Sequence, residues 1–203
     1  MVIQPHDLLK LKKENQLMKT EGLPEWLSRS VSDVRFVVVR REPIVDGNIP
    51  IGVRGKSRNE RFGTFIPFDD IIECVTPEQL AAQRKWKSHP HYDDYDLFQS
   101  LDLVESILQK YRLLWGPTGS VGFQLASGQH TVTETSDLDI IIRANEIPIN
   151  MAESIISEFQ QAKVRIDPLI EMQHGAVSLI EYSKQNQPFL IRTLEGPKLI
   201  TIV

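Results

Sequence analysis

Two aspartates lead directly into a run of three isoleucines, and this pattern constrains the fold more than any other feature of the chain. Asp137 and Asp139 are followed by Ile140, Ile141 and Ile142. Because β-branched side chains favour a pleated, buried surface, the run predicts a strand. Successive side chains of a strand point to opposite faces, so both carboxylates share one face with Cα atoms roughly 7 Å apart. A divalent cation can bridge two carboxylates placed in this way.

The metal is expected to be Mg²⁺, with Mn²⁺ as a possible substitute. Carboxylates without histidine or cysteine companions offer hard oxygen ligands, which suit these ions better than zinc. Upstream, the turn Gly-Pro-Thr-Gly-Ser ends in Gly119 and Ser120. Glycine lets the backbone approach a polyphosphate, and the amides of a following helix can donate to it. Each half of this pattern also occurs without any function, but their order predicts transfer of a phosphorylated nucleotide.

A third carboxylate, Asp167, strengthens the prediction of a site. It lies in a short apolar run, residues 164–169, after a helix expected over about 150–162. A strand, helix and neighbouring strand would bring Asp167 to the same sheet edge, where it would complete a metal site and help to orient an attacking hydroxyl. The alternative is that Asp167-Pro168 simply ends a strand in a turn. Glu171 and Glu181 are the substitutes if the register is different.

Composition excludes several classes of protein. The 203 residues carry a net charge of −4, with 41% hydrophobic and 25% charged residues, which is ordinary for a globular protein and argues against a general nucleic-acid binder. No apolar stretch of about 18 residues could span a bilayer, and the first residues lack a secretory apolar region. We therefore expect a cytoplasmic protein that binds neither nucleic acid nor membrane.

Hydrophobic periodicity predicts a chain of mixed class, α/β (α+β), with two domains. Residues 35–40 predict a strand, and Asp46-Gly47 predicts a hairpin turn before another strand at 49–53. Thr76 and Gln79 form a capping-box pattern that begins a helix, and a second helix is expected over 95–110. Strands are expected at 112–115, 175–181 and 188–192. The polar stretch 87–94 is the best candidate for a linker, so we expect a mostly β domain at 1–86 and a catalytic domain at 87–203.

A basic segment of the first domain is the second candidate site. Residues 52–62 combine flexible glycines with Arg54, Lys56, Arg58 and Arg61. Arginine suits bidentate recognition of phosphate. The alternative is an exposed basic hairpin without a special purpose. If the segment is functional, it would lie across a cleft from the aspartates.

Several of these motifs together resemble a known family. Gly119-Ser120, Asp137-Leu138-Asp139 and Asp167 resemble the nucleotidyltransferase superfamily related to DNA polymerase β. Three longer segments, 49–62, 115–123 and 192–197, together with Pro5-His6-Asp7-Leu8-Leu9, resemble the malonate decarboxylase holo-acyl-carrier-protein synthases, which are also called phosphoribosyl-dephospho-CoA transferases. The resemblance covers nearly the whole chain.

This resemblance implies a fold and a reaction. The fold is an N-terminal, mostly β, substrate- or partner-binding domain followed by a nucleotidyltransferase domain whose mixed sheet is flanked by helices. In the reaction, a serine of the malonate decarboxylase acyl carrier protein attacks triphosphoribosyl-dephospho-CoA and releases pyrophosphate. Asp137, Asp139 and Asp167 would be catalytic metal ligands. The residues expected to bind substrate are Gly119, Ser120, Arg54, Arg58 and Arg61.

Two other functions remain open at this point. The first is another magnesium-dependent nucleotidyltransferase that uses ATP to adenylylate a protein or a small molecule. The second is a catalytically silent module that binds a nucleotide or a carrier protein. The presence of both Asp137 and Asp139 argues against a silent module.

Overall fold

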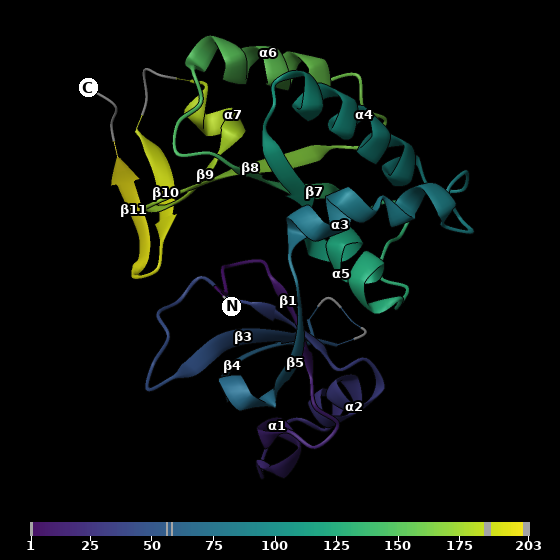
Figure 1. Cartoon of the computed structure of the whole chain (residues 1–203), viewed down its shortest axis with the longest axis vertical. Coiled ribbons are helices and arrows are strands. Elements are labelled where there is room, and N and C mark those ends of the chain that lie inside the picture. The colour runs from purple at the N-terminus through teal and green to yellow at the C-terminus, as the bar shows by residue number, and fades with distance from the viewer. Residues whose placement is uncertain (1, 56, 58, 185–187, 201–203) are drawn as a thin grey trace.

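The computed structural model describes residues 2–55, 57, 59–184 and 188–200, and it contains two β-sheets that are each covered by helices (Figure 1). The first sheet has five strands and the second has six. The chain therefore has an α+β fold, as the sequence predicts. Arg58, one of the expected phosphate ligands, lies outside the described residues.

The first sheet is antiparallel throughout. Its strands lie in the order β4-β3-β2-β1-β5, with the bounds β1 (Leu8–Leu11), β2 (Phe36–Val39), β3 (Asn48–Arg54), β4 (Arg61–Pro67) and β5 (Ile71–Val75). Two helices, α1 (Gln16–Lys19) and α2 (Glu25–Asp33), lie on the side of this sheet that is remote from the second sheet (Figure 1). A short 3-10 helix, Phe68–Asp70, joins β4 to β5. Leu27 and Val31 of α2 are buried in the core between helix and sheet.

The second sheet is mixed. Its order is β11-β10-β9-β8-β7-β6, with the bounds β6 (Leu114–Pro117), β7 (Leu138–Arg143), β8 (Ile166–Met172), β9 (Gly175–Ser178), β10 (Phe189–Thr193) and β11 (Gly196–Ile200). Among the described pairings, only that of β7 with β8 is parallel. Between these two strands runs the crossover helix α6 (Ile149–Phe159). Because β7 and β8 are parallel, the βαβ unit brings the first residues of both strands to the same end of the sheet.

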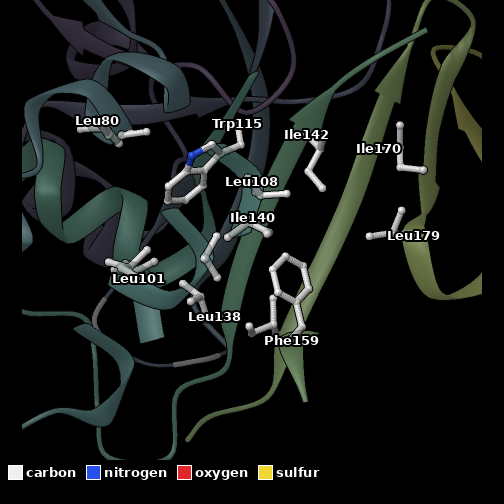
Figure 2. Packing of buried hydrophobic residues seen from close by; sticks show 14 of the residues in the cluster. Leu80, Leu101, Leu108, Trp115, Leu138, Ile140, Ile142, Phe159, Ile170 and Leu179 are labelled. Carbon is white, nitrogen blue, oxygen red and sulfur yellow. The ribbon is translucent and has the colours of Figure 1, made fainter. Parts of the chain in front are cut away.

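Helices cover the second sheet and complete its core. They are α3 (Pro77–Gln83), α4 (Asp96–Lys110), α5 (Gly119–Ser127) and α7 (Leu179–Tyr182), together with α6 and a 3-10 helix at Lys85–Ser88. The apolar stripe of α4, which includes Leu101 and Leu108, packs with Ile140 and Ile142 of β7 (Figure 2). This packing buries Ile140 and Ile142, whereas Ile141, which is also fully buried, points to the opposite face of the sheet.

Most of the expected elements are confirmed. Strand β2, the turn at Asp46-Gly47, helices α3, α4 and α6 and strand β8 all lie within a few residues of their expected positions. The side chain of Thr76 accepts from the backbone of Gln79, and the side chain of Gln79 accepts from the backbone of Thr76, so the capping box is present. Among the described residues, no helix has the length and apolar character needed to cross a bilayer.

Two local expectations are corrected. The strand expected over 175–181 ends at Ser178, and residues 179–182 form the helix α7, in which Leu179 and Tyr182 are buried. The turn considered at Asp167-Pro168 does not form, because β8 continues through both residues. The ladder between β8 and β9 begins only at Leu169, so Pro168 lies before it and its missing N–H disturbs none of those pairings.

The two sheets are joined by α3 and by ion pairs. Helix α3 follows β5 of the first sheet, and its buried Leu80 belongs to the core of the second sheet (Figure 2). Arg41 Nη1 donates to Glu171 Oε1 over 2.5 Å, linking the segment after β2 to β8. Arg143 Nε on β7 donates to Glu78 Oε1 of α3 over 2.7 Å. The domain boundary expected at residue 86 stays a prediction.

Candidate active site

The paired aspartates lie at the start of β7, where the structure adds the third carboxylate. Leu138 and Ile140 are fully buried, whereas Asp139 between them is only partly buried and lines a cavity. In the parallel ladder of β7 and β8, Asp139 is the direct register partner of Asp167. Adjacent strands lie about 4.8 Å apart, so the two carboxylates are neighbours across the ladder. Asp137, two residues before Asp139, lines the same cavity.

The glycine turn closes against Asp139. Thr118 N donates to the backbone oxygen of Asp139 over 2.9 Å, which ties the start of α5 to β7. Gly119 has φ of 59°. A Cβ atom at this position would lie 2.0 Å from Asp139 Oδ2. Glycine is therefore required here both by the backbone conformation and by the contact with the carboxylate.

The carboxylates act on one another electrostatically. Burial raises the pKa of Asp139 above its usual value, and the negative charges of Asp167 and Asp137 raise it further. The positive charges of Arg54 and Arg61 oppose this shift. A cation at this position would remove the repulsion, so the donor set fits a divalent metal with oxygen ligands.

The side chains of the three aspartates do not all point toward a common metal position. In the part of the chain that the structure describes, no three histidine, cysteine, aspartate or glutamate side chains are arranged to hold an ion. Asp167 Oδ1 instead accepts from Arg165 Nη2 over 2.9 Å. Binding of a metal by all three aspartates requires Asp167 to exchange this partner. The side chain of Arg165 is mostly exposed, so solvent is available to replace Asp167 as its partner.

The aspartates open into a cavity of about 1030 Å³ that is lined by both sheets. The volume is at the upper end of the range typical for small-molecule sites. Arg54 on β3 and Arg61 on β4 line it from the first sheet and are direct cross-strand partners. Gly119 and Ser120 line it from the second sheet together with Asp137, Asp139 and Asp167. All expected site residues except Arg58, which is not described, thus meet in one cavity.

The substitutes considered for Asp167 lie elsewhere. Glu171 pairs with Arg41 between the sheets. Glu181 lies on α7, where its Oε2 accepts from Leu190 N over 3.3 Å. Neither residue is part of the cavity lining.

Sequence reasoning missed a hydroxyl-rich loop that lines the cavity between α5 and β7. Its residues include Thr131, Thr133, Thr135 and Ser136. Thr133 N donates to Ser136 Oγ over 2.9 Å, and Thr131 Oγ1 donates to Ser120 O over 2.8 Å, so the loop is folded onto the glycine turn. The signal was the polar run Thr-Val-Thr-Glu-Thr-Ser immediately before the aspartates.

A buried glutamine holds this loop in place. Gln124 of α5 is 4% exposed, and its Oε1 accepts from Thr131 N at 2.8 Å and from Val132 N at 2.9 Å.

Sequence reasoning also missed two cavity residues next to the first sheet. Arg40 follows β2 directly, and His6 lies just before β1. Their position depends on strand pairing between segments far apart in the sequence, so no local pattern indicates it.

Comparison with known proteins covers both halves of the chain. The family model for the N-terminal domain of phosphoribosyl-dephospho-CoA transferase MdcG matches residues 4–77, and the model for its C-terminal domain matches residues 79–202. No solved structure matches the chain significantly.

Curated relatives span nearly the whole chain. A phosphoribosyl-dephospho-CoA transferase of Pseudomonas fluorescens (strain Pf0-1) is 34% identical over 97% of this chain and 92% of the relative. Proteins of the same name are 33% identical in Pseudomonas putida, over 98% of this chain and 93% of the relative, and 30% identical in Klebsiella pneumoniae (strain 342), over 97% and 93%. The chain is therefore a transferase that belongs to the phosphoribosyl-dephospho-CoA transferase family.

Proposed function

We propose that this transferase moves the phosphoribosyl-dephospho-CoA group from triphosphoribosyl-dephospho-CoA to a serine of the malonate decarboxylase acyl carrier protein and releases pyrophosphate. The observation that carries the proposal is the convergence of Asp137, Asp139 and Asp167 on one wall of a cavity whose opposite wall holds Arg54 and Arg61. Family membership supports the donor. The carrier protein follows from the resemblance of the motifs described above.

The bond changes define what the site has to do. The serine oxygen forms a bond to the phosphorus nearest the ribose, and the bond from that phosphorus to the oxygen bridging to the next phosphate breaks. Pyrophosphate leaves with the electron pair, and the serine proton passes to a base. We assign the proton to Asp167, which is partly exposed and is the register partner of Asp139.

Positioning and electrostatics are expected to supply most of the catalysis, as is usual for phosphoryl transfer. Asp137, Asp139 and Asp167 would hold Mg²⁺ or Mn²⁺, which when bound neutralises charge on the reacting phosphate and on the leaving group. Ser120 and the first amides of α5 would bind phosphate oxygens, and Ser120 would form no covalent intermediate. Arg54 and Arg61 would bind the donor from the opposite wall.

A transfer assay with two donors tests this function. Purified protein is incubated with Mg²⁺ and the apo form of the carrier protein, with either triphosphoribosyl-dephospho-CoA or ATP as donor. We expect the mass of the carrier to increase and pyrophosphate to appear with the CoA derivative. Transfer from ATP alone would indicate an adenylylating enzyme, and binding without any transfer would indicate a silent module.

The variant Asp137→Asn makes the assay specific for the site. Asp137 is exposed, so its replacement should leave the fold intact. Removal of a metal-binding carboxylate is expected to reduce transfer by about a thousandfold or more. Exposed Glu153 on α6 provides a control, and Glu153→Gln should transfer at the normal rate.

A further inference from the structure

The cavity wall formed by the first sheet contains a patch of bare backbone. Gly52 on β3 and Gly63 on β4 are direct cross-strand partners, and both line the cavity. Val38 of β2 is the partner of Gly52 on its other side. Partners in a ladder project to the same face of the sheet, so two adjacent positions on the cavity face lack side chains.

Arg40 occupies the space that these glycines leave. A Cβ atom at position 63 would lie 2.2 Å from Arg40 Nη1 and 2.7 Å from its Cζ, and a Cβ at position 52 would lie 3.6 Å from its Cγ. Arg40 N donates to Pro50 O over 2.9 Å, which fixes the start of the side chain. Nη2 pairs with Glu42 Oε1. The side chain is 39% exposed and lines the cavity, so its guanidinium is oriented by the sheet yet accessible to a ligand.

The guanidinium of Arg40 lies at a distinct place on the wall. Gly63, which it covers, follows Arg61 by two residues on the same face of β4. Two residues of an antiparallel strand span roughly 7 Å. Arg61 and its cross-strand partner Arg54 line the same cavity as the carboxylates. Arg40 therefore offers a second cationic position, displaced along β4 from the first.

We propose that Arg40, seated on Gly63, binds the diphosphate of the dephospho-CoA part of the donor. This inference rests on the proposed function, because that donor carries two separate anionic groups, the triphosphate that reacts and the diphosphate between adenosine and pantetheine. A cavity of about 1030 Å³ with carboxylates on one wall and two cationic positions on the other matches such a ligand. Arginine binds diphosphate oxygens through paired N–H donors, which a lysine cannot reproduce.

Calorimetry with two probes tests the inference. Dephospho-CoA is titrated into the protein in EDTA, and inorganic tripolyphosphate is titrated in the presence of Mg²⁺. We expect Arg40→Gln to weaken binding of dephospho-CoA by about tenfold or more and to change binding of tripolyphosphate by less than about twofold. In the transfer assay the KM for the donor should rise while kcat changes little.

Gly63→Ala displaces the guanidinium without removing its charge. The atom that the new methyl group meets is the end of a flexible side chain, so the sheet is expected to keep its structure. This variant should reproduce the loss of dephospho-CoA affinity seen with Arg40→Gln. Arg29→Gln, which removes an exposed arginine of α2, should change neither affinity. Circular dichroism checks the fold of each variant. If Gly63→Ala is unfolded, the result with Arg40→Gln is sufficient to test the proposed subsite.

The two proposals fail in different ways. Unchanged dephospho-CoA affinity in Arg40→Gln, or an equal loss for both probes, would overturn the subsite and leave the proposed function standing. If the normal protein binds dephospho-CoA through Arg40 but transfers nothing from the triphosphoribosyl donor, the subsite stands and the proposed function falls.

Discussion

Asp139 shows how strongly a single residue of this site is constrained by its neighbours. Its carboxylate touches the position where Gly119 lacks a side chain, and it stands beside Asp167 in the ladder. Burial and two like charges make its ionised form unfavourable in the folded protein. The residue is therefore a source of instability that a bound cation would relieve.

We expect Asp139→Asn to raise the melting temperature of the metal-free protein at pH 7.5 while abolishing transfer. Because the folded pKa of Asp139 is raised, the folded state binds the proton more tightly than the unfolded state, and ionisation above that pKa lowers stability. Asparagine removes this cost. Calorimetric melting should also show that Mg²⁺ stabilises the normal protein and Glu153→Gln but not Asp139→Asn. Equal stabilisation of all three by Mg²⁺ would contradict a metal site at Asp139.

The positions of Asp137, Asp139 and Gly119 could be predicted from sequence because their signal is local. Strand alternation fixes which carboxylates share a face, and a glycine before a helix is visible without the fold. Arg40 could not be found in this way. Its placement depends on Gly63, which is 23 positions later in the numbering and reaches it only through the pairing of three strands.

Among the elements, the loop between α5 and β7 is anchored by one buried side chain, that of Gln124. Gln124 projects from α5, and its Oε1 accepts hydrogen bonds from two backbone N–H groups of the loop. The loop has no described strand or helix between Ser127 and Leu138. This anchor and the hydrogen bond from Thr131 Oγ1 to Ser120 O together position the hydroxyl groups of the loop in the cavity.

Gln124→Ala is expected to loosen the loop and raise the KM for the donor. It leaves the buried N–H group of Val132 and the partly buried N–H group of Thr131 without their acceptor, at a cost of about 2 kcal/mol. Hydrogen exchange should accelerate about tenfold or more over residues 129–136 and stay unchanged in α6. Gln109→Ala, at an exposed position of α4, is the control. Unaltered exchange in the loop would show that Gln124 does not anchor it.

Elements with a strong apolar period were predictable, and those decided by tertiary packing were not. The stripe of α4 and the run in β7 each carry their own signal. Residues 175–181 are mostly apolar and contain no turn signal, so their pattern predicts one strand. The chain instead turns into α7 at Leu179, because Leu179 and Tyr182 fill the core beneath α6.

At the scale of the whole molecule, ion pairs contribute to holding the two sheets together. Arg41 and Glu171 are 130 positions apart, and both side chains are largely buried. Nearby, Arg143 lies between Glu78 and Asp7, with Nη2 3.9 Å from Asp7 Oδ1. Neither contact has a local sequence signal, because each joins segments that are far apart in the chain.

Asp7 gives this junction a dependence on pH. Its side chain is buried, and Oδ1 has no hydrogen-bond partner in the described structure. Burial raises the pKa of Asp7 to about 6 from a usual value of 3.8. The stabilising effect of protonation is therefore complete below about pH 4 and is lost as the pH rises through 6.

We expect Asp7→Asn to stabilise the protein by about 3 kcal/mol at pH 8 and by much less at pH 4. Urea unfolding of both proteins across this range measures the difference. The titration of His6, whose pKa burial lowers to about 4, affects both proteins and cancels in the comparison. Asp33→Asn, at an exposed position of α2, should show no such trend. A difference that does not vary with pH would mean that Asp7 is ionised normally in the folded state.

The opposed walls of the cavity have a consequence for how this enzyme can diversify. The acidic cluster belongs to one sheet and the arginines to the other, and the backbone passes between them just before Pro77. Under the proposed function, the carboxylates that react and the arginines that bind part of the donor belong to consecutive stretches of the polypeptide. We expect that replacing the part of the chain before Pro77 with that of a relative changes which coenzyme derivative is accepted, while the three aspartates stay in place.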